Sequence, residues 1–202
     1  IFYGDDQQKP DVAVREAEKM LKEHRVNLVA GFMWSNTLMA AQKSIVESKT
    51  GLLILNAGAS PLAGPLCSPY IVSTSFNNDQ FAESLGKLMS EEKIESIYLM
   101  SPNYQAGKDM LAGFRRYYKG KVIDQLLFKL GATDYQAEIS RVRAGKPEGV
   151  FIFAPFLQRY VQPFLIDTLG NVPGIGWLFA GPPYGIGILT AGLILGIMVL
   201  PF

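Results

Sequence analysis

The 202-residue chain has few of the residues on which metal sites and covalent catalysis depend. Cys67 is its only cysteine and His24 its only histidine. A single cysteine excludes an internal disulfide and any zinc site built from several cysteines. Catalysis by a Ser-His-Asp or Cys-His arrangement would need His24, which ends a charged segment and is expected to be a solvated residue at a helix end. We therefore expect no enzyme, no metal and no other cofactor.

The chain also lacks a strong net charge. Nineteen Lys and Arg residues balance 18 Asp and Glu residues, which leaves a net charge of +1 and disfavours a nucleic-acid partner. Charge is abundant up to Arg159, whereas Asp167 is the only Asp, Glu, Lys or Arg residue beyond it. The first residues, Ile1 to Asp6, lack the basic and apolar segments of a secretory signal, so we expect the chain to start inside a domain.

The clearest local pattern lies in residues 27–60. Residues 27–31 form a short apolar run that predicts a strand, residues 37–46 have apolar residues at helical spacing, and residues 52–55 predict a second strand. The loops that follow the two strands fall where an open parallel sheet binds ligands. They are the first candidates for a binding site.

Each of these loops has a feature suited to a ligand. Ser35 or Asn36 is expected to cap the helix, and a capping hydroxyl beside the free amides of a first turn can hold a carboxylate. A plain helix cap without a ligand is the alternative. The second loop contains small residues that let a ligand approach the backbone, although a glycine there often serves only a turn; they are Ala57, Gly58, Ala59 and Ser60.

Strand and helix patterns alternate through most of the chain. Residues 1–4 are expected to end a strand, and a second alternating series runs from Ile94 to Ala154. Such alternation predicts an α/β fold with parallel sheets. We expect two lobes, residues 1–75 and 76–154.

Six segments in unbroken order carry a family resemblance: DDQQKPDVAV, GFMWSNT, NAGAS, STSFNNDQ, YLMSPNYQAGKDMLAGF and LGATDYQAEISRVRAGKPEGVFIFAP. Residues 1–154 resemble type I periplasmic binding proteins, in particular the substrate-binding proteins of branched-chain amino acid type ABC importers. The resemblance implies two flavodoxin-like parallel-sheet lobes, truncated relative to the family, that close on a small ligand by hinge motion. It also implies ABC permease subunits as partners, and a location in the periplasm or on the extracellular face of a bacterial inner membrane.

The resemblance assigns roles to single residues. Ser35 matches the serine whose hydroxyl takes the ligand carboxylate. Ala59 and Ser60 match an Ala-Thr pair that binds polar groups of the ligand through backbone and hydroxyl. Tyr104 matches a tyrosine that closes over the ligand, although its position alone fits an aromatic residue in a surface loop equally well.

Two further matches bear on the ligand. Asn78 or Asp79 stands where the family has an aspartate near a ligand ammonium. Trp34 replaces a smaller residue that is common in amino-acid binders and permits a planar ligand. The ligand implied is an amino acid, an aromatic acid or an amide.

Residues 151–202 instead resemble the inner-membrane permease subunit of a phosphate ABC importer. Residues 184–202 form an uncharged run of 19, near the minimum for a transmembrane helix, with a buried core helix as the alternative. We expect residues 155–202 to be an apolar helical, permease-like tail, which would anchor the protein in the membrane through 184–202.

Two unrelated parts would then meet near residues 151–155, by recombination or by mis-assembly of sequence reads. The rival to solute binding is a membrane permease fragment of a phosphate ABC importer in a fused or chimeric chain. A third reading, an enzyme of the flavodoxin-like superfold, rests on fold analogy alone.

Overall fold

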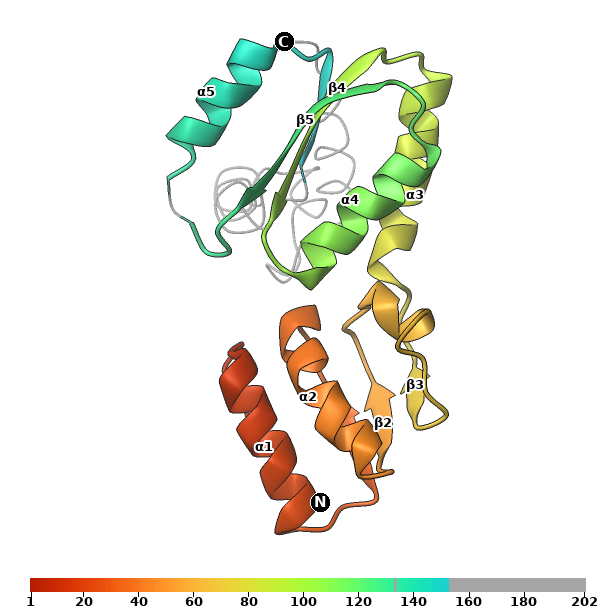
Figure 1. Ribbon diagram of the computed structural model, residues 1–202, viewed down its shortest axis with the longest axis vertical. Helices are drawn as coiled ribbons and strands as arrows, with labels where there is room; N and C mark the ends of the chain where they lie inside the picture. The colour runs from red at the N-terminus through yellow and green to blue at the C-terminus, as the bar shows by residue number, and fades with distance from the viewer. Residues whose placement is uncertain (133, 153–202) are drawn as a thin grey trace, which may run out of the picture. The chain divides into compact units, whose positions relative to one another are not determined.

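The computed structural model describes residues 1–132 and 134–152, which fall into two compact units (Figure 1). The first unit contains residues 1–92 and 103–119. The second contains residues 93–102 and the described residues from 120 onward.

The sheet of the first unit is parallel and has three strands in the order β1-β2-β3. They are β1 (Leu28–Gly31), β2 (Gly51–Ile54) and β3 (Ile71–Ser73). Each strand is only three or four residues long, so packing against helices must supply most of its stability.

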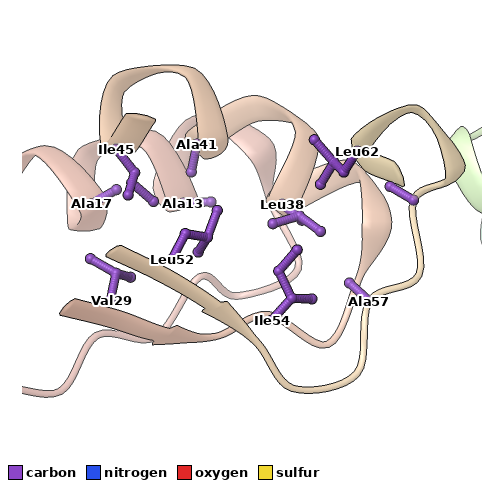
Figure 2. Close-up of a cluster of buried hydrophobic side chains, with 11 residues drawn as sticks. Ala13, Ala17, Val29, Leu38, Ala41, Ile45, Leu52, Ile54, Ala57 and Leu62 are labelled. Atoms are coloured by element: carbon purple, nitrogen blue, oxygen red, sulfur yellow. The ribbon is translucent and has the colours of Figure 1, made fainter. Parts of the chain in front are cut away.

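Two helices cover this sheet with small and branched apolar side chains. Helix α1 (Pro10–Lys22) begins with proline, whose fixed φ suits a first helical position, and packs against α2 (Ser35–Glu47). In Figure 2 the side chains of both helices point toward those of β1 and β2. The buried cluster contains Ala13, Ala17, Val29, Leu38, Ala41, Ile45, Leu52, Ile54, Ala57, Ala59 and Leu62.

Helices α3 (Asn78–Glu91) and α4 (Gln105–Tyr117) pack closely in the first unit. Gly86 and Gly113 lie at the crossing, where an added Cβ would come within 2.3 Å of the Phe114 carbonyl oxygen and 2.2 Å of the Asp79 carbonyl oxygen, respectively. Only glycine allows the two backbones to approach so closely.

The second unit also has a parallel three-stranded sheet. Its strands, β4 (Ser96–Pro102), β5 (Lys121–Phe128) and β6 (Gly149–Ile152), lie in the order β5-β4-β6. The first strand of this unit, β4, is thus central, with β5 and β6 on either side, as in the 2-1-3 core of flavodoxin-like sheets. Helix α5 (Gln136–Gly145) packs on β5, and the core contains Tyr98, Met100, Leu126, Phe128 and Val150.

The α/β class and the parallel sheets are confirmed, whereas two local predictions are wrong. Residues 1–4 form no strand. Helix α2 is capped by Trp34 and not by Ser35 or Asn36, because the extended residue is Trp34 (φ −110°, ψ 134°) and Ser35 already lies inside the helix.

Three expectations are not decided by the described residues. The lobe boundaries at 75 and 76 stay a prediction. The tail at 155–202 and its candidate transmembrane helix at 184–202 lie outside the described residues. Among residues 1–132 and 134–152, no helix is long and apolar enough to cross a membrane.

Candidate functional site

The two loops of the first unit that were predicted to bind a ligand are joined by hydrogen bonds. Gly31 (φ +145°) and Phe32 (φ +65°) turn the chain sharply after β1. The Asn56 side chain then donates to the Met33 carbonyl at 3.2 Å, and the Ala57 amide donates to the Phe32 carbonyl at 3.1 Å. The loops after β1 and β2 therefore form one wall.

The N-terminus of α2 opens onto this wall. No side chain caps it, and the first-turn amides of Ser35, Asn36 and Thr37 have no intrahelical acceptor. The Asn36 Oδ1 atom is buried without a hydrogen-bond partner in the described residues. Free amides at the positive end of a helix favour an anion.

Ser35 does not cap its helix, and its hydroxyl oxygen accepts a hydrogen bond from another element instead. Ser35 is 3% exposed, and its Oγ accepts a hydrogen bond of 3.1 Å from the Asn78 Nδ2 atom. The backbone amide of Asn78 donates to the Gly58 carbonyl at 2.7 Å, which fixes Asn78 beside the second loop. A Cβ on Gly58 would lie 2.2 Å from the Phe76 carbonyl oxygen, so the close approach needs glycine.

Asp109 of α4 ties three segments together. Its Oδ2 accepts from the Ser60 amide at 3.1 Å and from Asn78 Nδ2 at 3.0 Å, and its Oδ1 accepts from Gln105 Nε2 at 2.8 Å. Asp109 is 6% exposed. The Ser60 amide is thus occupied, whereas the Ser60 Oγ is buried without a partner among the described residues.

Asp79 faces a different environment from its neighbour Asn78. Its Oδ2 lies 3.0 Å from Arg116 Nη2, and Arg116 also pairs with Glu83. These ion pairs help raise the pKa of the Arg116 guanidinium above its usual range, with the hydrogen bond to Asp79 the largest cause. Of the two residues considered for the ammonium position, Asn78 contacts Ser35, and Asp79 serves the pairing of α3 with α4.

Two aromatic side chains mark the starts of α2 and α4. Trp34 and Tyr104 are the N-cap residues of these helices, and their ring centroids lie 6.3 Å apart. Burial, with a smaller contribution from the Asp109 charge, raises the pKa of Tyr104 to about 12. The phenol therefore stays neutral to a higher pH than an ordinary tyrosine does. Two positive helix ends and two aromatic rings come together within one unit.

A cavity of about 210 Å³ lies beside this polar cluster. Ala57, Gly58 and Ala59 contribute to its wall, and the remaining lining is mostly apolar: Ile54, Leu62, Ala63, Ile71, Ser73 and Asn77. Within the ranges that the structure describes, no group of three or more His, Cys, Asp or Glu side chains could hold a metal.

The family is decided by a comparison with known proteins. The family model for periplasmic binding proteins matches residues 1–157. The chain belongs to the periplasmic binding protein family. A Leu/Ile/Val-binding protein homolog of Brucella abortus is 22% identical over 173 residues, which cover 80% of this chain and 44% of the homolog.

A solved structure is similar to this periplasmic binding protein in fold and sequence. It is a solute-binding protein of an ABC transporter from Rhodopseudomonas palustris in complex with 3,4-dihydroxybenzoic acid. The identity is 26% and the TM-score 0.69, over 82% of this chain and 48% of that one. The periplasmic binding protein described here thus spans about half the length of these relatives.

The second resemblance is also confirmed. A segment of 54 residues is 54% identical to the phosphate transport system permease protein PstC of Haemophilus influenzae, covering 27% of this chain and 17% of that protein. The chain therefore combines a periplasmic binding protein segment with a short PstC-like segment.

The predicted site residues fall into three groups in this periplasmic binding protein. Trp34, Ser35, Asn36, Asn78 and Tyr104 lie at or beside the starts of α2, α3 and α4; Ala57, Gly58, Ala59 and Ser60 form the neighbouring loop; and Asp79 pairs with Arg116 instead. Their part in ligand binding stays a prediction.

The sequence reasoning missed Asp109 and Gln105. One feature of the sequence could have indicated Asp109. It is an acidic residue that shares a face of α4 with the small residues Ala106 and Gly113.

Proposed function

We propose that this protein is the solute-binding component of an ABC importer and binds a small carboxylate without chemical conversion. The observation that carries the proposal is the uncapped start of α2, where first-turn amides and the Ser35 hydroxyl are available together. A carboxylate accepts hydrogen bonds only, so it matches such a set of donors. The positive end of the helix adds a favourable electrostatic contribution.

Three features favour an aromatic acid over an amino acid. The Trp34 and Tyr104 rings, tilted 55° to each other, each offer an aromatic face to a planar ligand. A neutral side chain, Asn78, contacts Ser35, and the carboxylate of Asp79 pairs with Arg116 through Oδ2. The ammonium of an amino acid would therefore meet an amide, and not a carboxylate, next to Ser35. The ligand of the Rhodopseudomonas palustris relative is an aromatic acid as well.

The carboxylate of Asp109 does not contradict this proposal. It accepts three hydrogen bonds, from the Ser60 amide, Asn78 and Gln105, and such donors disperse its charge. Asp109 fixes the position of these three donors. The first-turn amides of α2 and the Ser35 hydroxyl are then the donors that face the ligand.

The transport role implies a location and partners. The protein would act in the periplasm or at the extracellular face of a bacterial inner membrane, and would deliver its ligand to ABC permease subunits. The small net charge provides no attraction for nucleic acid.

Calorimetric titration of the full chain with benzoate, benzamide and leucine tests the proposal. We expect benzoate to bind, leucine to bind more weakly, and Ser35→Ala to weaken benzoate binding about tenfold, as expected for one hydrogen bond to a charged group. Ser44→Ala in the same helix is the matched control, because its hydroxyl bonds only the Ala41 carbonyl within its own helix. A folded protein that binds no carboxylate would refute the function, and tighter binding of leucine would refute the aromatic class.

The second candidate is a permease fragment of a phosphate ABC importer in a fused or chimeric chain. It is favoured by the 54% identity to PstC over 54 residues. Membrane fractionation of the expressed chain separates the candidates, because a wholly soluble product excludes a working permease segment. Amplification across codons 145–165 from source DNA tests whether the join is real, and failure to recover a continuous product would leave assembly error as the explanation.

A further inference from the structure

We infer that Asp109 fixes the Ser35 hydroxyl as a hydrogen-bond donor to the ligand, acting through the Asn78 amide, and so makes the site prefer a carboxylate over the corresponding amide. The inference rests on the proposed function, since it concerns the same site. Asp109 is then a positioning residue for ligand selection.

The first step is the orientation of the Asn78 amide. Its Nδ2 atom lies 3.0 Å from Asp109 Oδ2 and 3.1 Å from Ser35 Oγ. A carboxylate can only accept, so Asn78 must turn its NH₂ group, and not its carbonyl, toward Asp109. Both N–H bonds of Asn78 are then used, one on Asp109 and one on Ser35.

The second step is the direction of the Ser35 hydroxyl. Because Ser35 Oγ accepts from Asn78, its own hydrogen is not needed for that contact and can donate elsewhere. The ligand-facing donors are then this hydroxyl and the first-turn amides of α2.

The third step concerns what happens without the Asp109 carboxylate. An alanine at position 109 can neither accept nor donate, so the Asn78 amide is free to turn its carbonyl toward Ser35. The Ser35 hydrogen would then bond Asn78 and be lost to the ligand. A carboxylate ligand loses more by this change than an amide ligand, whose NH₂ group can donate to the Ser35 oxygen.

Asp109→Ala separates this mechanism from simple electrostatics, because the two predict opposite signs. If Asp109 acted only as a negative charge near the ligand, its removal would tighten the binding of an anion. If it orients Asn78 and Ser35, its removal weakens benzoate binding and leaves benzamide binding nearly unchanged. We expect the preference for benzoate over benzamide to fall about tenfold, the effect of one hydrogen bond to a charged group.

A double-mutant cycle tests whether the effect passes through Ser35. The preference for benzoate over benzamide is measured by calorimetry for the full-length wild type, Asp109→Ala, Ser35→Ala and the double variant. We expect Asp109→Ala to have almost no further effect on this preference once Ser35 is alanine, because interacting residues are not additive. Asp11→Asn, which removes an exposed carboxylate of α1, is the charge control and should leave the preference unchanged.

The outcomes distinguish the two proposals. A wild type that binds neither benzoate nor another carboxylate refutes the proposed function. A wild type that prefers benzoate, with an Asp109→Ala preference that is unchanged, increased or additive with Ser35→Ala, overturns the inference about Asp109 alone. Should Asp109→Ala fail to fold, Asn78→Ala replaces it in the cycle, with the same expected loss of preference and the same contradicting results.

Discussion

Replacing Gly58 by alanine should destabilise the protein and displace Asn78 from the site. The new Cβ would lie 2.2 Å from the Phe76 carbonyl oxygen and 3.0 Å from Asn78 Oδ1. Atoms in ordinary contact are about 3.5 Å apart, so the Phe76 backbone must retreat by roughly 1 Å. That shift also stretches the bond from the Asn78 amide to the Gly58 carbonyl, now 2.7 Å long.

The magnitude follows from these two effects. Overpacking costs about 1 to 3 kcal/mol and the loss of a hydrogen bond about 1 kcal/mol, so the free energy of unfolding should fall by about 3 kcal/mol. For a chain of this size the midpoint of thermal unfolding should fall by about 6 to 12 °C. Circular dichroism during heating of the full chain measures this midpoint. The affinity for benzoate should also be lower in the variant.

Gly149→Ala is the matched control. Its Cβ would lie 3.6 Å from the nearest atom, Ile94 Cγ2, which is an ordinary contact. We expect its unfolding midpoint to stay close to that of the wild type. A Gly58→Ala protein that unfolds at the wild-type temperature and binds benzoate normally would refute the reasoning. The positions of Phe76 and Asn78 would then not require a glycine at position 58.

The remaining predictions concern the aromatic pair and the core. Trp34→Ala should weaken benzoate binding about threefold to tenfold and leave acetate binding unchanged in calorimetry; equal losses for both would contradict stacking on the ring. Burial raises the pKa of Tyr104 to about 12 from an ordinary value of 10, so the contribution of Tyr104 to stability should be constant below pH 10 and be lost as the pH rises from 10 to 12. Tyr104→Phe should reduce this loss in urea titrations. Leu38→Ala, at a fully buried position, should cost about 2 to 5 kcal/mol of unfolding free energy in urea, whereas Leu66→Ala, at an exposed position, should cost little; equal costs would contradict the observed core.

Sequence periodicity was sufficient for the fold because short buried strands and amphipathic helices leave strong patterns. The run at residues 27–31 and the helical spacing of Leu38, Ala41 and Ile45 reappear as β1 and the buried face of α2. The N-cap was predicted wrongly, since a serine before a helix fits the usual preference. What overrode that preference was a tertiary contact, the hydrogen bond from Asn78 to Ser35 across 43 positions in the sequence.

Asp109 could not be identified as part of the site from sequence alone for a related reason. Its partners Ser60 and Asn78 lie 49 and 31 positions away, and no local pattern reports contacts at such separations. The acidic residue on the small-residue face of α4 indicated that something must satisfy a buried carboxylate. Which groups do so depends on how the start of α4 meets the loops after β1 and β2.

The neighbouring residues Asn78 and Asp79 show how one helical step sets the chemistry of the site. Successive side chains on a helix point about 100° apart, so only one of the two can face Ser35. Asn78 contacts Ser35, while Asp79, 8% exposed, pairs with Arg116. A shift by one residue at the start of α3 would place a carboxylate against the Ser35 hydroxyl, which would then donate to the protein and favour a cationic group in the ligand. The observed register leaves that hydroxyl able to donate, and the proposed preference for a carboxylate ligand follows from it.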